Sequence, residues 1–251
     1  MTGNSNIIQK AIDILDYISD NPKGLKLSTI ANNLNIPKAT VFNILKTLMK
    51  NDFVQYANAD KKEYCIGSHA YGIGLTYLKT SVLFRIAKPY LVELGDKYKK
   101  AAYLSKRRND QAVLIYKFVP LNVKSGTGDT GETKTLHSTS IGKCYLAFDS
   151  EAAALIDTID LPARTPYTIT DREKLKANIA ELQILGYTWE KQEDYLHIAC
   201  LAAPLFKKDT MIGTISMSGR YNEDEDFTAQ GSELAQIAKQ ISAQLQKERN
   251  V

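Results

Sequence analysis

Three patterns in the sequence contain residue types that could perform chemistry. His137, Ser138 and Asp149 are the side-chain types of a hydrolytic triad, but no GxSxG turn and no separate oxyanion loop accompany them. Residues 126–131 spell GxGxxG, a dinucleotide-binding fingerprint, yet no immediate helix is predicted after them and no parallel βαβ unit surrounds them. We therefore expect no enzyme activity, and we interpret 126–131 as a mobile loop.

The third pattern is a polar face on a helix predicted over residues 38–50. Apolar residues that recur every three to four positions define the opposite, inner stripe of this helix. On the polar face, lysines and threonines can contact phosphates, and Asn43 can form hydrogen bonds with an adenine edge. The small Ala39 permits close approach to a major groove. With two residues of the preceding helix and two of a following hairpin, the predicted DNA-binding residues are Ser28, Thr29, Lys38, Ala39, Thr40, Phe42, Asn43, Lys46, Thr47, Lys61 and Lys62.

The elements around this face predict a winged helix-turn-helix over residues 1–67. Apolar spacing indicates a helix over 5–20, and a second, short helix begins at Ser28, a favourable N-cap, and ends before the break at 35–37. Residues 53–56 and 63–66 read as strands around the turn at 58–62. Three short helices alone also fit a small helical domain that does not bind DNA, but a hairpin directly after the third helix favours DNA binding.

The cysteines and histidines do not form a metal-binding pattern. Cys65, Cys144 and Cys200 are far apart, no CxxC pair is present, and the three histidines lack zinc-site spacing. Widely spaced, odd-numbered thiols are typical of reduced cysteines buried as small hydrophobic side chains. The sequence predicts neither a metal site nor any other cofactor.

Charge and composition limit the classes of partner. The net charge of +4 is compatible with nucleic acid without arguing for it. Residues 1–65 carry eight lysines against six acidic residues, a net of +2, which is weak for a lone DNA-binding unit. A doubled site on a two-fold-related operator is therefore expected. No apolar run approaches the roughly 18 residues that span a bilayer, so we expect no membrane association and a cytoplasmic protein.

The remainder of the chain predicts a linker over 68–88 and an α+β domain over 89–251. The linker helix suits dimerisation, or alternatively packs on its own domain's sheet, and Pro89 is expected to kink the apolar run after Leu83 or begin a new helix. Strands joined by short turns favour an antiparallel sheet flanked by helices. Strands are predicted over 101–105, 112–119, 198–206 and 211–218, and helices over 141–149, 151–158, 171–185 and 228–249.

Several ordered motifs resemble those of the isocitrate-lyase-regulator (IclR) family of bacterial transcription factors. Residues 136–147, LHSTSIGKCYLA, are similar to the family's LHxTAxGKAxLA, and residues 165–170, TPYTIT, are similar to its TxxTIT stretch. Residues 193–204, EDYLHIACLAAP, and 213–219, GTISMSG, resemble its ExxxGxxxxAAP and GxxSxSG blocks. The resemblance covers nearly the whole chain and implies a winged helix-turn-helix, a linker helix and a GAF-like effector-binding domain that assemble as dimers or tetramers.

The resemblance also implies an effector pocket. The matching positions are Ser140, Ile141, Glu190, Cys200, Ser216 and Ser218. Free N–H groups at the start of the helix predicted over 141–149, with two hydroxyls and a thiol, would hold a small acidic ligand without any Lys or Arg. The alternative for the two strand serines is local hydrogen bonding only.

Three residues depart from the family pattern. His197 stands where the family usually has Gly, and Glu190 replaces a shorter Asp of the best-known pockets, so both bear on the effector's identity. Asn43 replaces a frequent Arg of the recognition helix. Because Arg prefers guanine and Asn prefers adenine, position 43 is expected to read an A·T pair.

The working hypothesis is a homo-oligomeric repressor of a catabolic operon, with an activator as the alternative sign. Its expected partners are double-stranded operator DNA, a small organic-acid effector and further copies of itself. Two competing interpretations are an enzyme whose N-terminal unit serves protein contacts, and a ligand-binding module that has lost its DNA function. The missing Arg at position 43 gives slight support to the second of these.

Overall fold

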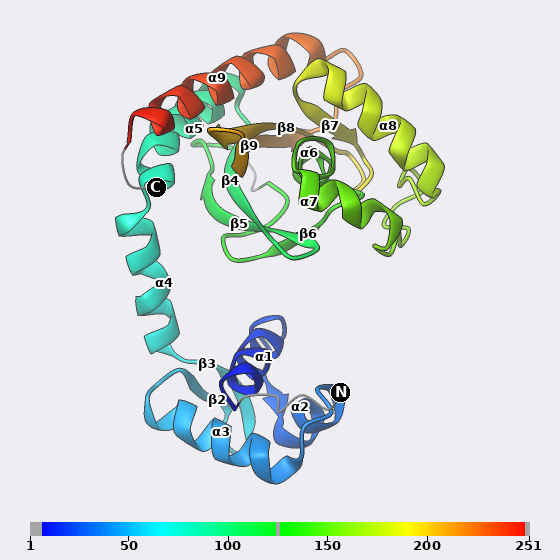
Figure 1. Ribbon diagram of the computed structural model, residues 1–251. Coiled ribbons are helices and arrows are strands. Elements are labelled where there is room, and N and C mark those ends of the chain that lie inside the picture. The colour runs from blue at the N-terminus through cyan, green and yellow to red at the C-terminus, as the bar shows by residue number, and fades with distance from the viewer. Residues whose placement is uncertain (1–6, 124–125, 249–251) are drawn as a thin grey trace. The chain divides into compact units, whose positions relative to one another are not determined.

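Helical periodicity dominates the first part of the chain, and strands alternate with helices in the rest. The computed structural model describes residues 7–123 and 126–248, whose elements are drawn in Figure 1. Contacts within the chain divide it after Thr80 into two compact units. Among the described residues, no helix is both long and apolar enough to cross a membrane.

The N-terminal unit is a helical core with a small antiparallel sheet. Its core contains Ile14 and Ile18 of the first helix, Ile30 of the second, and Val41 and Leu45 of the third. The sheet has the order β1-β3-β2, and β2 and β3 form the expected hairpin. The elements are α1 (Ile7–Ser19), β1 (Leu25–Lys26), α2 (Leu27–Asn33), α3 (Lys38–Lys50), β2 (Val54–Asn58), β3 (Glu63–Ile66) and α4 (Ser68–Thr80).

Two details of this unit differ from the sequence-based expectation. The helix α2 begins at Leu27, and Lys26 occupies the N-cap position without a side-chain cap, so the assignment of Ser28 as the N-cap is wrong. The reason is that Leu25 and Lys26 pair with Tyr64 and Glu63 as the unpredicted strand β1, which fixes the chain until just before the helix. Residues 5–6 of the predicted first helix lie outside the described residues.

The C-terminal unit is a six-stranded antiparallel sheet flanked by helices, which confirms the α+β class. The strand order is β6-β5-β4-β9-β8-β7. The helices α7 and η1 together replace the single helix expected over 151–158. The elements are α5 (Val82–Tyr98), β4 (Ala101–Arg108), β5 (Gln111–Phe118), β6 (Thr133–Thr135), α6 (Ser140–Phe148), α7 (Ser150–Ala153), the 3-10 helix η1 (Ala154–Asp157), α8 (Arg172–Leu185), β7 (Thr188–Lys191), β8 (Ile198–Lys207), β9 (Thr210–Arg220) and α9 (Phe227–Lys247).

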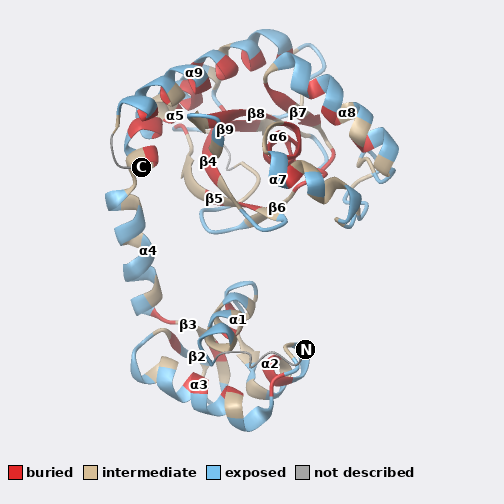
Figure 2. Ribbon diagram, in the orientation of Figure 1, coloured by how far each residue is buried: buried red, intermediate tan, exposed pale blue. Residues whose placement is uncertain are grey.

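Successive residues of a strand point to opposite faces of the sheet, and each face packs against its own layer of helices in the C-terminal unit. Ala102 and Leu104 of β4 join a hydrophobic cluster with α5 and α9, whereas Ala101 and Tyr103 join a second cluster with α6 and α8. This is the two-residue period of a strand buried on both faces. Figure 2 shows the buried residues along the sheet and on the inner sides of these helices. The second layer, beneath α6, contains the site described below.

Pro89 lies inside α5 and does not begin a new helix, so that alternative is wrong. A proline removes one helical hydrogen bond, but burial offsets this loss because Leu83, Ile86, Leu91 and Leu94 are all buried on the same helix. The packing of α5 on the sheet therefore keeps the helix continuous through the proline.

Candidate functional site

The helix α3 presents the polar face that the sequence predicts. Lys38, Ala39, Asn43, Lys46 and Thr47 are exposed, while Val41, Ile44 and Leu45 are buried in the core of the unit. The Phe42 ring is also on the outside, with 53% of its surface exposed. A large exposed aromatic ring among polar groups is suited to apolar contact with a thymine methyl group.

The remaining predicted DNA contacts are one residue of α3, two of α2 and two of the β2–β3 turn. Ser28 is exposed, and Thr29 and Thr40 are half-buried. Lys61 and Lys62 are exposed at the turn, where the side chain of Asn58 accepts a hydrogen bond from the Lys61 N–H at 2.9 Å. Lys62 adopts a left-handed conformation with φ of 52°, which turns the chain back into β3. The wing therefore carries two cations at its tip.

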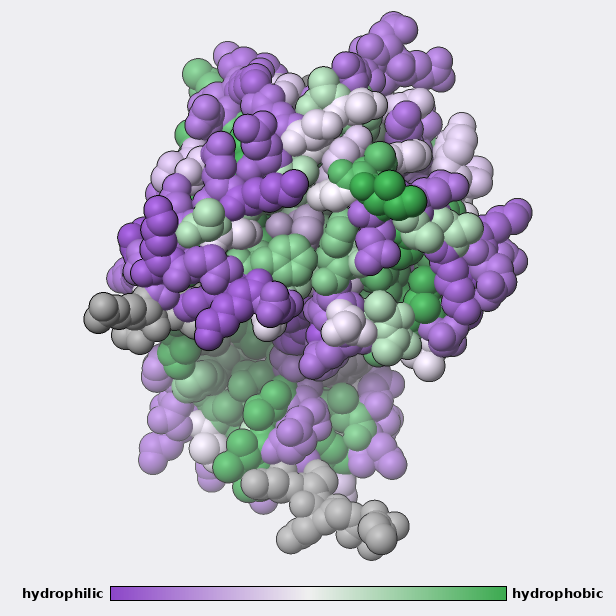
Figure 3. Space-filling view, turned by 45° about the horizontal axis from the view of Figure 1, so that its top comes forward, coloured by the Kyte–Doolittle hydropathy of each residue, from purple (hydrophilic) through white to green (hydrophobic). Residues whose placement is uncertain are grey.

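A second surface of the N-terminal unit is apolar. Ile7, Ile8 and Ile12 of α1 are exposed, as are Tyr71 and Ile73 of α4, a helix that has no buried residue. Hydrophobic side chains gather on the face of this unit that is visible in Figure 3. Large apolar side chains that are exposed together mark candidate sites of protein–protein contact.

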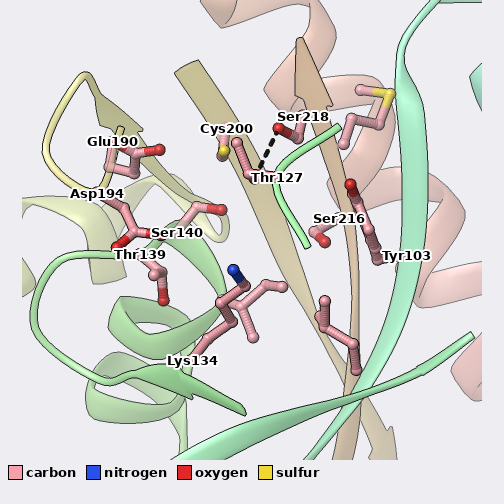
Figure 4. Close-up of a pocket in the computed structure, with 13 residues that line it drawn as sticks. Tyr103, Thr127, Lys134, Thr139, Ser140, Glu190, Asp194, Cys200, Ser216 and Ser218 are labelled. Atoms are coloured by element: carbon pink, nitrogen blue, oxygen red, sulfur yellow. Dashed lines mark hydrogen bonds between the residues drawn. The ribbon is translucent and has the colours of Figure 1, made fainter. Parts of the chain in front are cut away.

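The C-terminal unit contains a pocket of about 330 Å³, part of it continuous with solvent, on the sheet face that α6 covers. Figure 4 shows its polar side chains converging from the sheet, from α6 and from two loops. The lining residues are Tyr103, Leu114, Thr127, Lys134, Thr139, Ser140, Ile141, Glu190, Asp194, Cys200, Ser216, Met217 and Ser218.

Strand register builds the floor of this pocket. Glu190 pairs with Cys200, and Cys200 pairs with Ser218, so one row of partners crosses β7, β8 and β9. The adjacent row contains Ser216 opposite Tyr103 of β4. Directly opposed residues of an antiparallel sheet share a face, which explains how positions far apart in the sequence line one site.

The N-terminus of α6 forms one wall. The Thr139 side chain caps the helix by accepting a hydrogen bond from the Gly142 N–H at 2.9 Å. The N–H groups of Ser140 and Ile141, in the first turn, have no acceptor within the helix and are available at the pocket wall. Gly142 permits this placement, because a Cβ there would lie 2.2 Å from the carbonyl oxygen of Thr135.

Charged groups line the pocket on two sides. Glu190, Asp194 and Lys134 are 1%, 8% and 8% exposed. Burial raises the pKa of Glu190 to about 7, and burial also raises the pKa of Asp194, against the lowering effect of Lys134 and Arg164. Lys134 lines the pocket although no lysine was expected there, because strand β6, which carries it, was not predicted.

Two further polar groups face the same space. The Tyr103 hydroxyl is buried and has no hydrogen-bond partner among the described residues. Thr127 comes from the GxGxxG segment, and its hydroxyl shares a hydrogen bond of 3.1 Å with that of Ser218. No helix follows this segment, since Thr133–Thr135 is a strand, so the dinucleotide interpretation is excluded as expected. Mobility of the segment remains a prediction.

A buried ion pair supports the pocket from below. The Lys143 ammonium of α6 is fully buried and lies 2.5 Å from Glu193 Oε1 and 2.9 Å from Asn178 Oδ1. Burial lowers the pKa of Lys143 and raises that of Glu193, while their mutual attraction opposes both effects. The pair fixes α6 against the loop that carries Asp194.

The side chains that suggested a triad are engaged elsewhere. Ser138 shares a hydrogen bond of 2.7 Å with Thr135, and His137 Nε2 lies 3.0 Å from the carbonyl oxygen of Pro162. Asp149 pairs with Arg107 at 2.9 Å. Among the described residues, no cluster of His, Cys, Asp and Glu side chains is arranged to hold a metal ion.

All six residues that the family resemblance implied for the pocket line this one cavity. Seven further lining residues were not predicted, among them Tyr103 and Lys134. Their positions on β4 and β6 follow from pairing across the sheet, which no local pattern reveals. The position of Asp194 directly after Glu193 in the quoted family motif is the one signal that could have indicated it.

Comparison with known proteins identifies the class to which this fold and site belong. Residues 8–57 match the model of the IclR helix-turn-helix domain, and residues 75–243 match that of the bacterial transcriptional regulator IclR C-terminal domain. The chain therefore belongs to the IclR family of DNA-binding transcriptional regulators and not to an enzyme family.

Individual relatives agree with this assignment. The HTH-type transcriptional repressor AllR of Escherichia coli K12 is 27% identical over 244 residues, which are 95% of this chain and 89% of AllR. An IclR regulator from Silicibacter sp. TM1040 shares the fold with a TM-score of 0.83, at 20% identity and 97% coverage of both chains. An IclR homologue from Microbacterium hydrocarbonoxydans, complexed with 4-hydroxybenzoate, has a TM-score of 0.76 at 15% identity, covering 97% of this chain and 100% of its own.

Proposed function

We propose that this chain represses a catabolic operon and that a small organic acid, bound in the pocket beneath α6, controls its affinity for operator DNA. The observation that carries the proposal is the pocket itself, which is lined by Lys134, by the first turn of α6 and by Tyr103, whose hydroxyl has no partner among the described residues. These groups are hydrogen-bond donors, and together they suit a carboxylate. The ligand of the Microbacterium homologue is an organic acid as well, although that likeness shows only a shared fold.

The DNA half of the proposal assigns α3 to the major groove and the wing to the neighbouring phosphates. Asn43 and Phe42 would read an adenine edge and a thymine methyl group, and Lys46 would contact a phosphate. The exposure of all three side chains supports this role. The remaining predicted contacts on α2, α3 and the wing would position the unit without reading bases.

The apolar surface of α1 and α4 supports assembly through the N-terminal unit. Exposed Ile7, Ile8, Tyr71 and Ile73 would be covered in a dimer. Two linked copies would double the phosphate contacts of a unit whose net charge is small, and would match a two-fold-related operator. A tetramer of two such dimers is the alternative assembly.

Replacement of Lys46 with Ala tests the docking of α3. We expect weaker operator binding and a salt dependence, log K against log salt, that is shallower by about 1, because one phosphate contact is lost. Fluorescence anisotropy of labelled operator DNA at several salt concentrations measures both. The matched control is Lys79→Ala, which removes the same charge from exposed α4. Equal DNA affinity of the Lys46 variant and the control would refute this docking.

A further inference from the structure

The pocket offers hydrogen-bond acceptors as well as donors. A plain carboxylate would use the donors, namely the Lys134 ammonium, the N–H groups of α6 and the Tyr103 hydroxyl. Glu190 and Asp194, by contrast, add two buried carboxyl groups to the lining. Where these carboxyl groups are ionised, an anion placed beside them without a donor of its own would face repulsion and would leave an acceptor without a partner.

The two carboxyl groups are not equivalent. Asp194 already has a cationic partner at the rim, since Arg164 Nε lies 3.2 Å from its Oδ1. Glu190 receives one hydrogen bond from a backbone donor, the Glu193 N–H at 2.8 Å, and adjoins the weakly donating Cys200 thiol. Above its pKa of about 7 Glu190 is ionised and can accept about four hydrogen bonds, so in that form it has unused accepting capacity inside the pocket.

The hydrogen-bond donors of the pocket and the Glu190 acceptor lie at different places along its lining. Figure 4 shows Glu190 at one end, Tyr103 and Ser216 at the other, and Lys134 and Ser140 between them. A ligand that contacts Lys134 or Tyr103 with one end therefore presents its other end to Glu190. The longer side chain of glutamate, compared with aspartate, brings the carboxyl group further from its strand.

We propose that the effector is a small acid that also carries an N–H donor, an amino or amide group, which binds Glu190 while its carboxylate binds Lys134 and the start of α6. This inference rests on the proposed effector site and specifies the ligand class. The N–H group would satisfy the buried carboxylate of Glu190 and offset the repulsion that a plain acid would meet there.

Two isosteric pairs of acids test this chemistry. Alanine and 2-methylpropanoate differ by an ammonium in place of a methyl group, and succinamate and 4-oxopentanoate differ by an amide NH₂ in place of a methyl group. The full chain is titrated with each acid by calorimetry and by the fluorescence of Trp189, the only tryptophan, which adjoins Glu190 in β7. In at least one pair we expect the N–H member to bind about tenfold more tightly.

Three variants test whether Glu190 causes the preference for the N–H member of each pair. Glu190→Gln keeps the shape and an acceptor for the Glu193 N–H, and should reduce the preference to less than about threefold. Glu181→Gln, on the exposed side of α8, is the matched control and should preserve it. Lys134→Met should weaken both members of a pair by a similar factor, because it removes the partner of their common carboxylate.

The outcomes separate this inference from the effector site on which it rests. Equal affinity of the methyl and N–H members in both pairs would overturn the inference, and so would a preference that persists in the Glu190→Gln variant. Neither result would contradict the proposed effector site. If none of the four acids binds, both proposals fail. Thermal unfolding of each variant, followed by Trp189 fluorescence, excludes a folding defect as the cause.

Discussion

Among single residues, Glu190 is the group whose charge depends most directly on its surroundings. Burial raises its pKa to about 7, and the charge of Glu193 acts in the same direction, while the Cys200 thiol, the Glu193 N–H and the Lys143 charge oppose it. The ordinary pKa of a glutamate is about 4.5. Because the folded state binds this proton more tightly than the unfolded state, ionised Glu190 reduces stability above pH 7 and the penalty disappears as the pH falls toward 4.5.

Replacement of Glu190 with Gln should therefore stabilise the protein at high pH only. At about pH 8 we expect a gain of up to about 3 kcal/mol, from a pKa difference of roughly 2.5 units, and at about pH 5 most of this gain should be absent. Urea unfolding followed by Trp189 fluorescence measures the difference at each pH. A gain of the same size at both values would show that desolvation does not control this carboxyl group.

His197 is a position whose residue type is informative in the sequence but whose backbone conformation is not. The sequence shows a histidine where the resembling family usually has glycine, and the structure gives His197 a φ of 63°, in the left-handed region that favours glycine. Its carbonyl oxygen accepts a hydrogen bond from the Tyr221 N–H at 2.8 Å, which fixes the turn before β8. The replacement of glycine by histidine is visible in the sequence, but the left-handed backbone that makes it costly is visible only in the structure.

At the scale of elements, long periodic segments were predictable and short edge strands were not. The bounds of α3 and α8, and the caps of α8 at Asp171 and Gly186, agree with the apolar spacing and capping residues. The strands β6 and β7 are three and four residues long and lie at the two edges of the sheet. Too few residues alternate in them to give a signal, so their pocket residue Lys134 was missed and Glu190 came only from the family resemblance.

The exposed helix α4 is the element whose role is most open to a direct test. Replacement of Ile73 with Asp should dissociate the proposed dimer and weaken operator binding by more than about tenfold, because the two half-sites would no longer be bound by linked units. Sedimentation velocity measures the assembly, and anisotropy measures DNA binding. Ile184→Asp, at an isoleucine of α8 that is 87% exposed, makes the same exchange away from α4 as a control. A dimeric Ile73 variant would exclude α4 from the interface.

At the scale of the whole molecule, the chain joins a helix-turn-helix unit to a unit that contains a candidate effector pocket. An effector changes DNA affinity only if it binds one arrangement of the protein more tightly than the other, and the effect is reciprocal. The pocket is lined by residues of all six strands and of α6, so a ligand there would touch the whole sheet of the C-terminal unit. The linkage between the two units is therefore the claim that most needs measurement.

The most direct measurement is the anisotropy of a DNA fragment selected from the source genome by the full-length protein, with and without an acid that changes Trp189 fluorescence. We expect the acid to change the apparent Kd for DNA by about tenfold or more. The Lys134→Met variant should keep its DNA affinity but lose this response. An acid that binds the protein and leaves its affinity for DNA unchanged would contradict the account.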